Sequence, residues 1–148
     1  MINHLAASVP RTVTVRGNCL LNTGIADVVD IVLKYDKRVM GFVYASWFEP
    51  RKTRETVVVG EERTAIFDDL SDRKLRLYDN TDVTKPCESL RIEKQSPLQN
   101  QCIHFLESVI TREKPVTDSY QGHVVVRILE CAQESLETGK EIEIDYAS

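Results

Sequence analysis

One stretch, residues 28–60, constrains the fold of this chain more than any other. Strand-forming residues alternate through Asp27–Tyr35 and again through Val39–Phe48, and the turn Asp36-Lys37-Arg38 lies between them. This pattern predicts two long antiparallel strands. In Val39–Phe48 neither set of alternate residues is polar, so we expect this strand to be covered on both faces. The same stretch also carries the densest positive charge of the chain.

Further strands and two helices are predicted in the rest of the sequence. Short extended segments are expected at Arg11–Arg16, Arg54–Val59, Ala65–Asp68, Leu75–Tyr78, Ser89–Ile92 and Ile142–Tyr146. Apolar residues at helical spacing follow Pro97 as far as Pro115, and again follow Asp118 as far as Gly139, which predicts two helices of about four turns each. Strands that precede helices and are joined by tight turns indicate an α+β fold. We expect an open, mostly antiparallel sheet with two long helices on one face.

The composition favours a single soluble domain that spans residues 1–148. A net charge of −4 and a pI of about 5.4 argue against nucleic acid as a partner. No apolar run approaches the roughly 20 residues that a membrane-spanning helix needs, so no membrane partner is expected. The start of the chain has no basic signal-peptide region. A cytoplasmic location is therefore expected.

The cysteines and histidines are not arranged as ligands. None of the four cysteines forms a CxxC pair, which favours reduced thiols and argues against a zinc site. The cysteines are Cys19, Cys87, Cys102 and Cys131, and the histidines are His4, His104 and His123.

Two helices cover only one face of such a sheet, so the other face of Val39–Phe48 needs a different cover. Phe42, Tyr44 and Phe48, or alternatively Val43 and Trp47, would otherwise form an exposed apolar patch. We interpret this patch as an interface with another subunit or domain, which predicts a homodimer or a larger homo-oligomer. The alternative is that residues 1–10 and 80–95 fold over it.

An ordered set of short motifs carries a resemblance to a known family. The set begins with Gly24 to Val28, continues through Ser46-Trp47 and Pro50-Arg51-Lys52, and ends with Lys114 to Asp118. Val58 to Gly60 and Phe67-Asp68-Asp69 lie between them. The chain resembles the C-terminal domain of the Gfo/Idh/MocA family of oxidoreductases over about residues 9–140, most of all the members that oxidise sugars and sugar nucleotides.

The resemblance implies a fold and a partner domain. The family domain is an open sheet with helices on one face, like the C-terminal domains of dihydrodipicolinate reductase and glyceraldehyde-3-phosphate dehydrogenase, and its other face commonly builds the oligomer. Residues 1–8 would be the remnant of a longer helix. Family members bind NAD(P) on a Rossmann domain, whose glycine-rich turn the six glycines of this chain cannot form. We therefore expect no cofactor in this chain, and NAD(P) only on a separate Rossmann domain.

Candidate ligand contacts cluster at the end of the long strands. Arg51, Lys52 and Arg54 place three cations within four residues, and an arginine fork suits a carboxylate or phosphate. The resemblance puts this loop near the substrate cleft. Trp47 is a second candidate because its ring can stack on a sugar, although a core or interface role competes, and Asn22 is a candidate that also suits a turn. Lys114 lies in the sequence Glu113-Lys114-Pro115, which has the same letters as the family's catalytic lysine motif. In the family that motif belongs to the Rossmann domain, so no catalytic residue is expected in this chain.

Two functional hypotheses from different classes follow. The first is an isolated substrate-binding and dimerisation domain of an NAD(P)-dependent sugar or sugar-nucleotide oxidoreductase, which alone does not transfer hydride. The second is a stand-alone, non-enzymatic module that binds sugar acids, or a purely structural dimer.

Overall fold

The computed structural model describes residues 1–148 except 22–23, 37, 93–95 and 148, and the chain falls into two compact units. Unit 1 comprises Met1–Phe48 and Arg112–Ser148, and unit 2 comprises Glu49–Thr111. The α+β class is confirmed, and each strand pair among the described residues is antiparallel. None of the described helices is long and apolar enough to cross a membrane.

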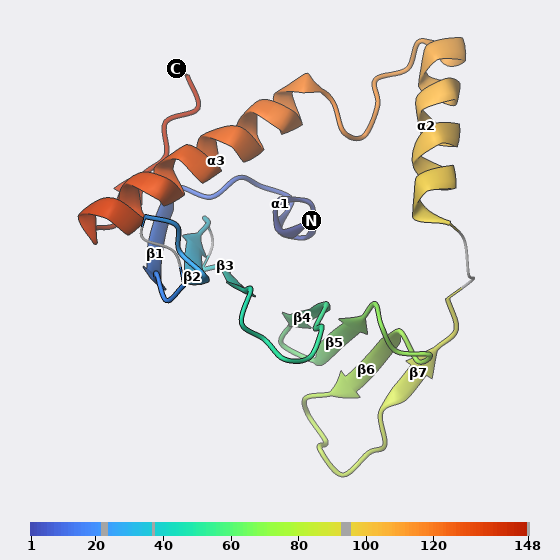
Figure 1. Ribbon diagram of the computed structural model, residues 1–148. Coiled ribbons are helices and arrows are strands. Elements are labelled where there is room, and N and C mark those ends of the chain that lie inside the picture. The colour runs from blue at the N-terminus through green and yellow to red at the C-terminus, as the bar shows by residue number, and fades with distance from the viewer. Residues whose placement is uncertain (22–23, 37, 93–95, 148) are drawn as a thin grey trace. The chain divides into compact units, whose positions relative to one another are not determined.

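Unit 1 is a four-stranded sheet in the order β3-β2-β1-β8, with α3 packed against β1 and β8 (Figure 1). Its elements are α1 (Ile2–Ala6), β1 (Thr12–Asn18), β2 (Val28–Lys34), β3 (Met40–Ser46), α3 (Ser119–Thr138) and β8 (Ile142–Glu143). The long strands predicted from residues 28–60 are thus the pair β2–β3, whose register runs from Val28 opposite Ser46 to Lys34 opposite Met40.

The hydrophobic core of unit 1 lies between this sheet and α3. Val13, Val15 and Leu33 point inward from β1 and β2, and Cys131 and Ala132 meet them from α3. Alternate residues of a strand face opposite sides, so the intervening positions of β1, β2 and β3 form the outer face of the sheet.

A buried hydroxyl completes the edge of β1 where β8 ends. Strand β8 pairs only with Thr12 and Val13 of β1, so the next backbone donor along that edge needs another acceptor. The Oγ of Ser135, which is fully buried in α3, accepts from the Val15 amide at 2.9 Å. The same hydroxyl donates to the carbonyl of Lys140 at 2.5 Å. One side chain therefore ties the helix to both the strand and the turn that follows the helix.

A hydrogen bond and a close contact help to attach the short helix α1 to the sheet. Tyr35 is only 7% exposed, and its hydroxyl donates to Oδ1 of Asn3 at 2.6 Å. The side chain of Ile2 lies over Gly41, where an added Cβ would meet it at 3.0 Å. The lack of a side chain at Gly41 lets α1 reach the sheet.

Unit 2 contains a second four-stranded sheet in the order β4-β5-β6-β7 (Figure 1). Its elements are β4 (Glu55–Val59), β5 (Arg63–Asp68), β6 (Leu75–Asp79), β7 (Glu88–Leu90) and α2 (Pro97–Thr111). The sequence predicted these strands within a single open sheet. The structure instead ends one sheet at Ser46 and begins the next at Glu55. The intervening segment contains Pro50, which has no backbone donor for a strand ladder, and the chain bends at Trp47, Pro50 and Arg51.

Candidate functional site

The basic segment that the sequence singled out lies immediately before β4 in unit 2. The side chains of Arg51, Lys52 and Arg54 are all exposed. The backbone of Arg54 is held by the fold, because its carbonyl accepts from the Asp69 amide at 3.0 Å. Its guanidinium Nη1 lies 3.9 Å from Oδ2 of the same aspartate.

Asp69 is the centre of this group of cations, which we call the Asp69 cluster: Lys52, Arg54, Asp69 and Lys74. The ammonium of Lys74 lies 2.8 Å from Asp69 Oδ1 and also donates to the Asp69 carbonyl at 3.0 Å. The hydrogen bond from Lys74 to the Asp69 carboxylate is the main cause that holds the pKa of Asp69 below its ordinary value, and the charges of Lys74, Arg54 and Lys52 add to it. Three cations thus share one carboxylate, which leaves an excess of positive charge at the surface.

The turn between β5 and β6 brings Lys74 to this place. The Asp68 amide donates to the Lys74 carbonyl at 2.8 Å, and Oδ1 of Asp68 accepts from the Leu70 amide at 3.0 Å. The sequence predicted a tight turn between the strands at Ala65–Asp68 and Leu75–Tyr78 but did not connect it with the basic segment, because register between hairpins is not visible in local patterns. The two parts of the cluster come from residues 52–54 and 69–74.

The side chains of the Asp69 cluster suit the binding of an anion but not acid–base catalysis. Guanidinium and ammonium donors suit the oxygens of a carboxylate or phosphate. The one carboxylate among them is already occupied by Lys74 and is held in its charged form, so it is a poor proton donor or acceptor. Among the described residues no group of three or more His, Cys, Asp or Glu side chains could hold a metal ion.

Trp47, the predicted stacking residue, belongs to unit 1, whereas the cations belong to unit 2. Its side chain is 82% exposed, and its amide donates to the Asp27 carbonyl at 2.9 Å. Asn22, the other predicted contact, lies outside the described residues. The structure therefore describes Trp47 and the cations in separate units.

The sequence predicted Asp27 only as the first residue of a strand and as part of a motif. It is 4% exposed, and its Oδ2 accepts from the amides of Leu20 and Leu21 at 2.7 Å each. A buried carboxylate that satisfies two backbone donors fixes a loop. The loop in turn displays Leu20, Leu21 and Ile25, which are 62%, 69% and 64% exposed.

The predicted interface residues lie on or beside the outer face of the first sheet. Phe42 and Tyr44 are 71% and 55% exposed and share that face with Met40. Phe48 is 44% exposed and follows the end of β3. Val43, the alternative, is half-buried and alternates with them, so it points to the side of the core.

Lys114 has a local partner that accounts for its position. Its ammonium lies 2.6 Å from Oδ2 of Asp118, and Oδ1 of Asp118 caps α3 by accepting from the Gln121 amide at 2.8 Å. The hydrogen bond with Asp118 raises the pKa of Lys114, and the same bond lowers the pKa of Asp118. A cation that supports a helix cap has a structural role.

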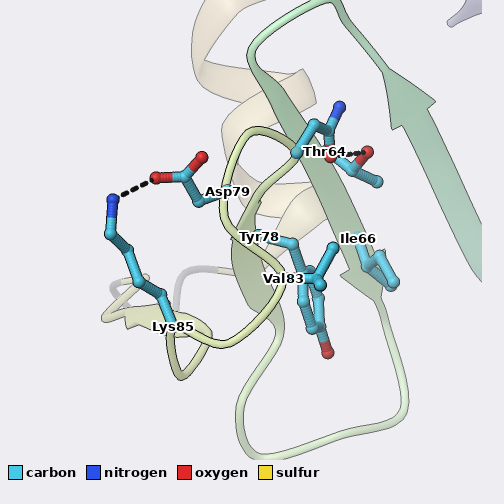
Figure 2. A pocket seen from close by; sticks show the side chains of 7 residues that line it. Thr64, Ile66, Tyr78, Asp79, Val83 and Lys85 are labelled. Carbon is cyan, nitrogen blue, oxygen red and sulfur yellow. Dashed lines mark hydrogen bonds and ion pairs between the residues drawn. The ribbon is translucent and has the colours of Figure 1, made fainter.

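Unit 2 also has a shallow hollow, shown in Figure 2, of about 290 Å³ between the side chains of Ile66, Tyr78 and Val83. Asp79 borders it, but its carboxylate accepts from Lys85 Nζ at 2.8 Å and from the Thr81 hydroxyl at 2.6 Å. The hydrogen bond with Lys85 is the main cause that holds the pKa of Asp79 well below its usual range, and the bonds with Thr81 add to it. The polar groups here close the loop after β6, so the hollow presents mainly apolar surface.

Comparisons with known proteins give a fold but no family by sequence. Neither the protein-family models nor the curated proteins contain a match to this chain. Among solved structures, UDP-N-acetylglucosamine 3-dehydrogenase GnnA from Acidithiobacillus ferrooxidans is similar with a TM-score of 0.79 at 20% identity, over 92% of this chain and 43% of the enzyme. Aldose-aldose oxidoreductase from Caulobacter crescentus gives a TM-score of 0.79 at 13% identity, over 97% and 44%. GenD2 from gentamicin A biosynthesis, solved in complex with NAD, gives a TM-score of 0.74 at 20% identity. The match covers 95% of this chain and 43% of GenD2.

The chain has the fold of an oxidoreductase domain. It spans less than half the length of the enzymes it matches, and those enzymes are of the Gfo/Idh/MocA type. The resemblance seen in the sequence is thereby confirmed for the fold. At such low identities the shared fold is what the likeness shows, and it does not transfer a site residue by residue.

Proposed function

We propose that this chain is the substrate-binding and subunit-contact domain of an NAD(P)-dependent oxidoreductase that acts on a sugar or sugar nucleotide. The observation that carries the proposal is the match of 92–97% of the chain to 43–49% of several oxidoreductases, two of which are named for sugar substrates. A domain of this size, matched nearly whole, is the unit that such enzymes combine with a second domain.

In the part of the chain that the structure describes, the start of the long helix α3 does not fit a dinucleotide. A pyrophosphate is bound by a glycine-rich turn at a helix N-terminus, where backbone donors are free. Helix α3 instead begins at Asp118, whose carboxylate occupies the Gln121 amide and carries the charge that repels a phosphate. We therefore assign NAD(P) to a separate coenzyme-binding domain, and hydride transfer to the combination of the two.

The Asp69 cluster supports an anionic sugar as the ligand. Two of its cations, Lys52 and Arg54, were predicted from the sequence, and Lys74 adds a third from a different hairpin. The outer face of the first sheet supports the subunit contact, because it exposes Met40, Phe42 and Tyr44. A single chain does not normally leave such an apolar group in water.

Calorimetric titration tests the ligand. The purified chain is titrated with UDP-N-acetylglucosamine, with neutral N-acetylglucosamine and with NAD. We expect the sugar nucleotide to bind and the other two not to bind measurably. The variant Arg54→Ala should lower the affinity for the sugar nucleotide by about tenfold or more, since a charge-assisted hydrogen bond contributes about 1.5–3 kcal/mol.

Arg91→Ala is the matched control, because it removes an exposed arginine of the same unit outside the Asp69 cluster. Its affinity should equal that of the wild type. Tight binding of NAD to the chain alone would overturn the assignment of NAD(P) to a separate coenzyme-binding domain. Equal binding of the neutral sugar and the sugar nucleotide would overturn the role of the cations.

A further inference from the structure

We propose that Asp69 is an internal counter-ion of the anion site, which neutralises Lys74 and leaves Lys52 and Arg54 to bind the ligand. This inference rests on the anion-binding role of the Asp69 cluster in the proposed function and specifies which cations bind and which class of anion they take. All four residues belong to unit 2. Three observations carry it: the unequal contacts of the Asp69 carboxylate, the available donors of Arg54, and the balance of charge.

Lys74 is the cation that Asp69 holds closely. Its ammonium lies 2.8 Å from Oδ1 of the carboxylate and donates to the Asp69 carbonyl at 3.0 Å. Its side chain is 34% exposed, whereas that of Arg54 is 63% exposed. Two of the three donors of the ammonium are therefore used within the chain. A lysine whose charge is matched by a carboxylate at hydrogen-bonding distance attracts a second anion only weakly.

Arg54 is the cation whose donors remain available. Its Nη1 lies 3.9 Å from Oδ2 of Asp69, which is longer than the roughly 2.7–3.2 Å of an N–H···O hydrogen bond. Within the described part of the chain, no hydrogen bond from this guanidinium is seen. The backbone nevertheless holds Arg54 beside Asp69, because the Arg54 carbonyl accepts from the Asp69 amide at 3.0 Å. The planar fork of the guanidinium is thus positioned by the fold and can donate to a phosphate.

Asp69 carries a lasting negative charge next to these cations. The hydrogen bond from Lys74 is the main cause that holds the pKa of Asp69 below its ordinary value, so the carboxylate stays ionised at neutral pH. The neighbouring carboxylates have other partners. Oε2 of Glu55 lies 3.7 Å from Nη2 of Arg76, and Oδ1 of Asp68 accepts from a backbone amide of the β5–β6 turn at 3.0 Å.

The charge balance of the Asp69 cluster indicates the class of ligand. Three cations and one carboxylate leave two positive charges, which are those of Lys52 and Arg54 once Asp69 is assigned to Lys74. The diphosphate of a sugar nucleotide carries two negative charges at neutral pH, whereas a sugar acid carries one. Because electrostatic attraction grows with the product of the charges, the site favours the sugar nucleotide over the sugar acid.

A neutralising substitution tests the role of Asp69. Calorimetric titration of the purified chain at low ionic strength measures the affinity for UDP-N-acetylglucosamine and for glucuronate. Asp69→Asn keeps the size of the side chain but removes its charge. One unit charge about 6 Å from an anion in water changes a binding constant about threefold per charge of that anion. We therefore expect Asp69→Asn to bind UDP-N-acetylglucosamine about tenfold and glucuronate about threefold more tightly than the wild type.

A double variant tests the assignment of Lys74. Lys74→Gln leaves the Asp69 charge unmatched, so the affinity for UDP-N-acetylglucosamine should fall about tenfold. Lys74→Gln combined with Asp69→Asn removes both members of a neutral pair. The double variant should bind within about threefold of the wild type, because Lys52 and Arg54 are unchanged.

Glu62→Gln is the matched control, because it neutralises an exposed carboxylate of the same unit far from the cluster. Glu62 precedes β5 and Asp69 follows it, so roughly 20 Å of strand separates them. The affinity of this variant should stay within about twofold of the wild type. In about 1 M sodium chloride all differences among the variants should shrink, since charges are screened within about 3 Å. Circular dichroism confirms that each variant folds.

The outcomes distinguish the counter-ion role from the anion site itself. Weaker or unchanged binding by Asp69→Asn would overturn the counter-ion role and leave the anion site in place. A double variant as weak as Lys74→Gln alone would overturn the assignment of Lys74, because that lysine would then contact the ligand directly. A wild type that binds neither UDP-N-acetylglucosamine nor glucuronate would overturn the anion site of the proposed function.

Discussion

Single polar residues in this chain hold long-range parts of the backbone together, and Ser135 is the clearest case. Replacement by alanine leaves the Val15 amide and the Lys140 carbonyl without their shared partner in a site of zero exposure. We expect Ser135→Ala to lower the free energy of unfolding by about 1–3 kcal/mol, since a buried group left unsatisfied costs that much. Urea denaturation followed by circular dichroism measures the change.

Thr138→Ala is the matched control for Ser135→Ala. Thr138 lies one turn further along α3, and its hydroxyl donates to the Glu134 carbonyl on the exposed side of the helix. This substitution should change the free energy of unfolding by less than about 0.5 kcal/mol. Similar losses for both variants would show that Ser135 contributes no more than an exposed hydroxyl.

Tyr35 gives the stability of unit 1 a dependence on alkaline pH. Burial raises the pKa of Tyr35 to about 12 from its ordinary value of 10.0, because the folded state disfavours the phenolate. A raised pKa means that the folded state holds the proton more tightly. The corresponding stability is therefore fully present below pH 10 and is lost as the pH rises towards 12.

We expect Tyr35→Phe to be less stable than the wild type at pH 8, because the hydrogen bond to Asn3 is lost. The difference should narrow as the pH rises above 10, since phenylalanine cannot ionise. Urea denaturation at a series of pH values measures both. Tyr146→Phe should behave alike, because burial also raises the pKa of Tyr146 to about 12. A difference that stays constant with pH would contradict the prediction.

At the scale of elements, the contact between β1 and α3 depends on a position without a side chain. A Cβ added to Gly17 would lie 2.7 Å from the Val28 carbonyl oxygen and 3.1 Å from Cδ1 of Leu136. The backbone oxygen cannot move without a shift of β2. We expect Gly17→Ala to reduce the free energy of unfolding by about 1–3 kcal/mol, as measured by urea denaturation.

Gly122→Ala provides a control of opposite sign on the same pair of elements. Gly122 lies inside α3, and a Cβ there would meet nothing within 4 Å. Alanine favours the helix, so this variant should gain about 0.5–1 kcal/mol. Equal effects of the two substitutions would show that backbone freedom, rather than close approach, determines the role of Gly17.

The elements themselves were largely predictable from the sequence, because their signals are local. Alternation placed β2 and β3 within a residue or two, and Pro97 and Asp118 marked the starts of both long helices. The division into two sheets was not predicted, because strand patterns give the faces of each strand but not its neighbours. Ser135 and Asp27 were likewise missed, since their partners are fixed only by the register and packing of distant segments.

The same limit applied to the candidate site. The cations before β4 were visible as a charge cluster in the sequence. The contacts of Asp69 and Lys74 with these cations depend on the conformation of the β5–β6 turn, which the sequence does not specify. Local charge therefore indicated where an anion could bind, and the fold supplied the groups that position the donors.

At the scale of the whole molecule, burial is divided unequally between the units. Every described residue that is less than a tenth exposed lies in unit 1, among them Val13, Leu33 and Cys131. The described residues of unit 2 are half-buried at most. Local stability follows buried apolar contact, so the two sheets should open with different free energies.

Hydrogen exchange followed by mass spectrometry measures that difference. We expect the amides of β1 and β2 to exchange on the order of 100-fold more slowly than those of β4, β5 and β6, which corresponds to about 2.7 kcal/mol in opening free energy. Gly17→Ala should accelerate exchange in β1 and β2 and leave β4 to β6 unchanged, because its strain acts on unit 1 alone. Equal protection of both sheets, or equal acceleration by the substitution, would mean that the units open together. The core beneath α3 would then stabilise the second sheet as well as the first.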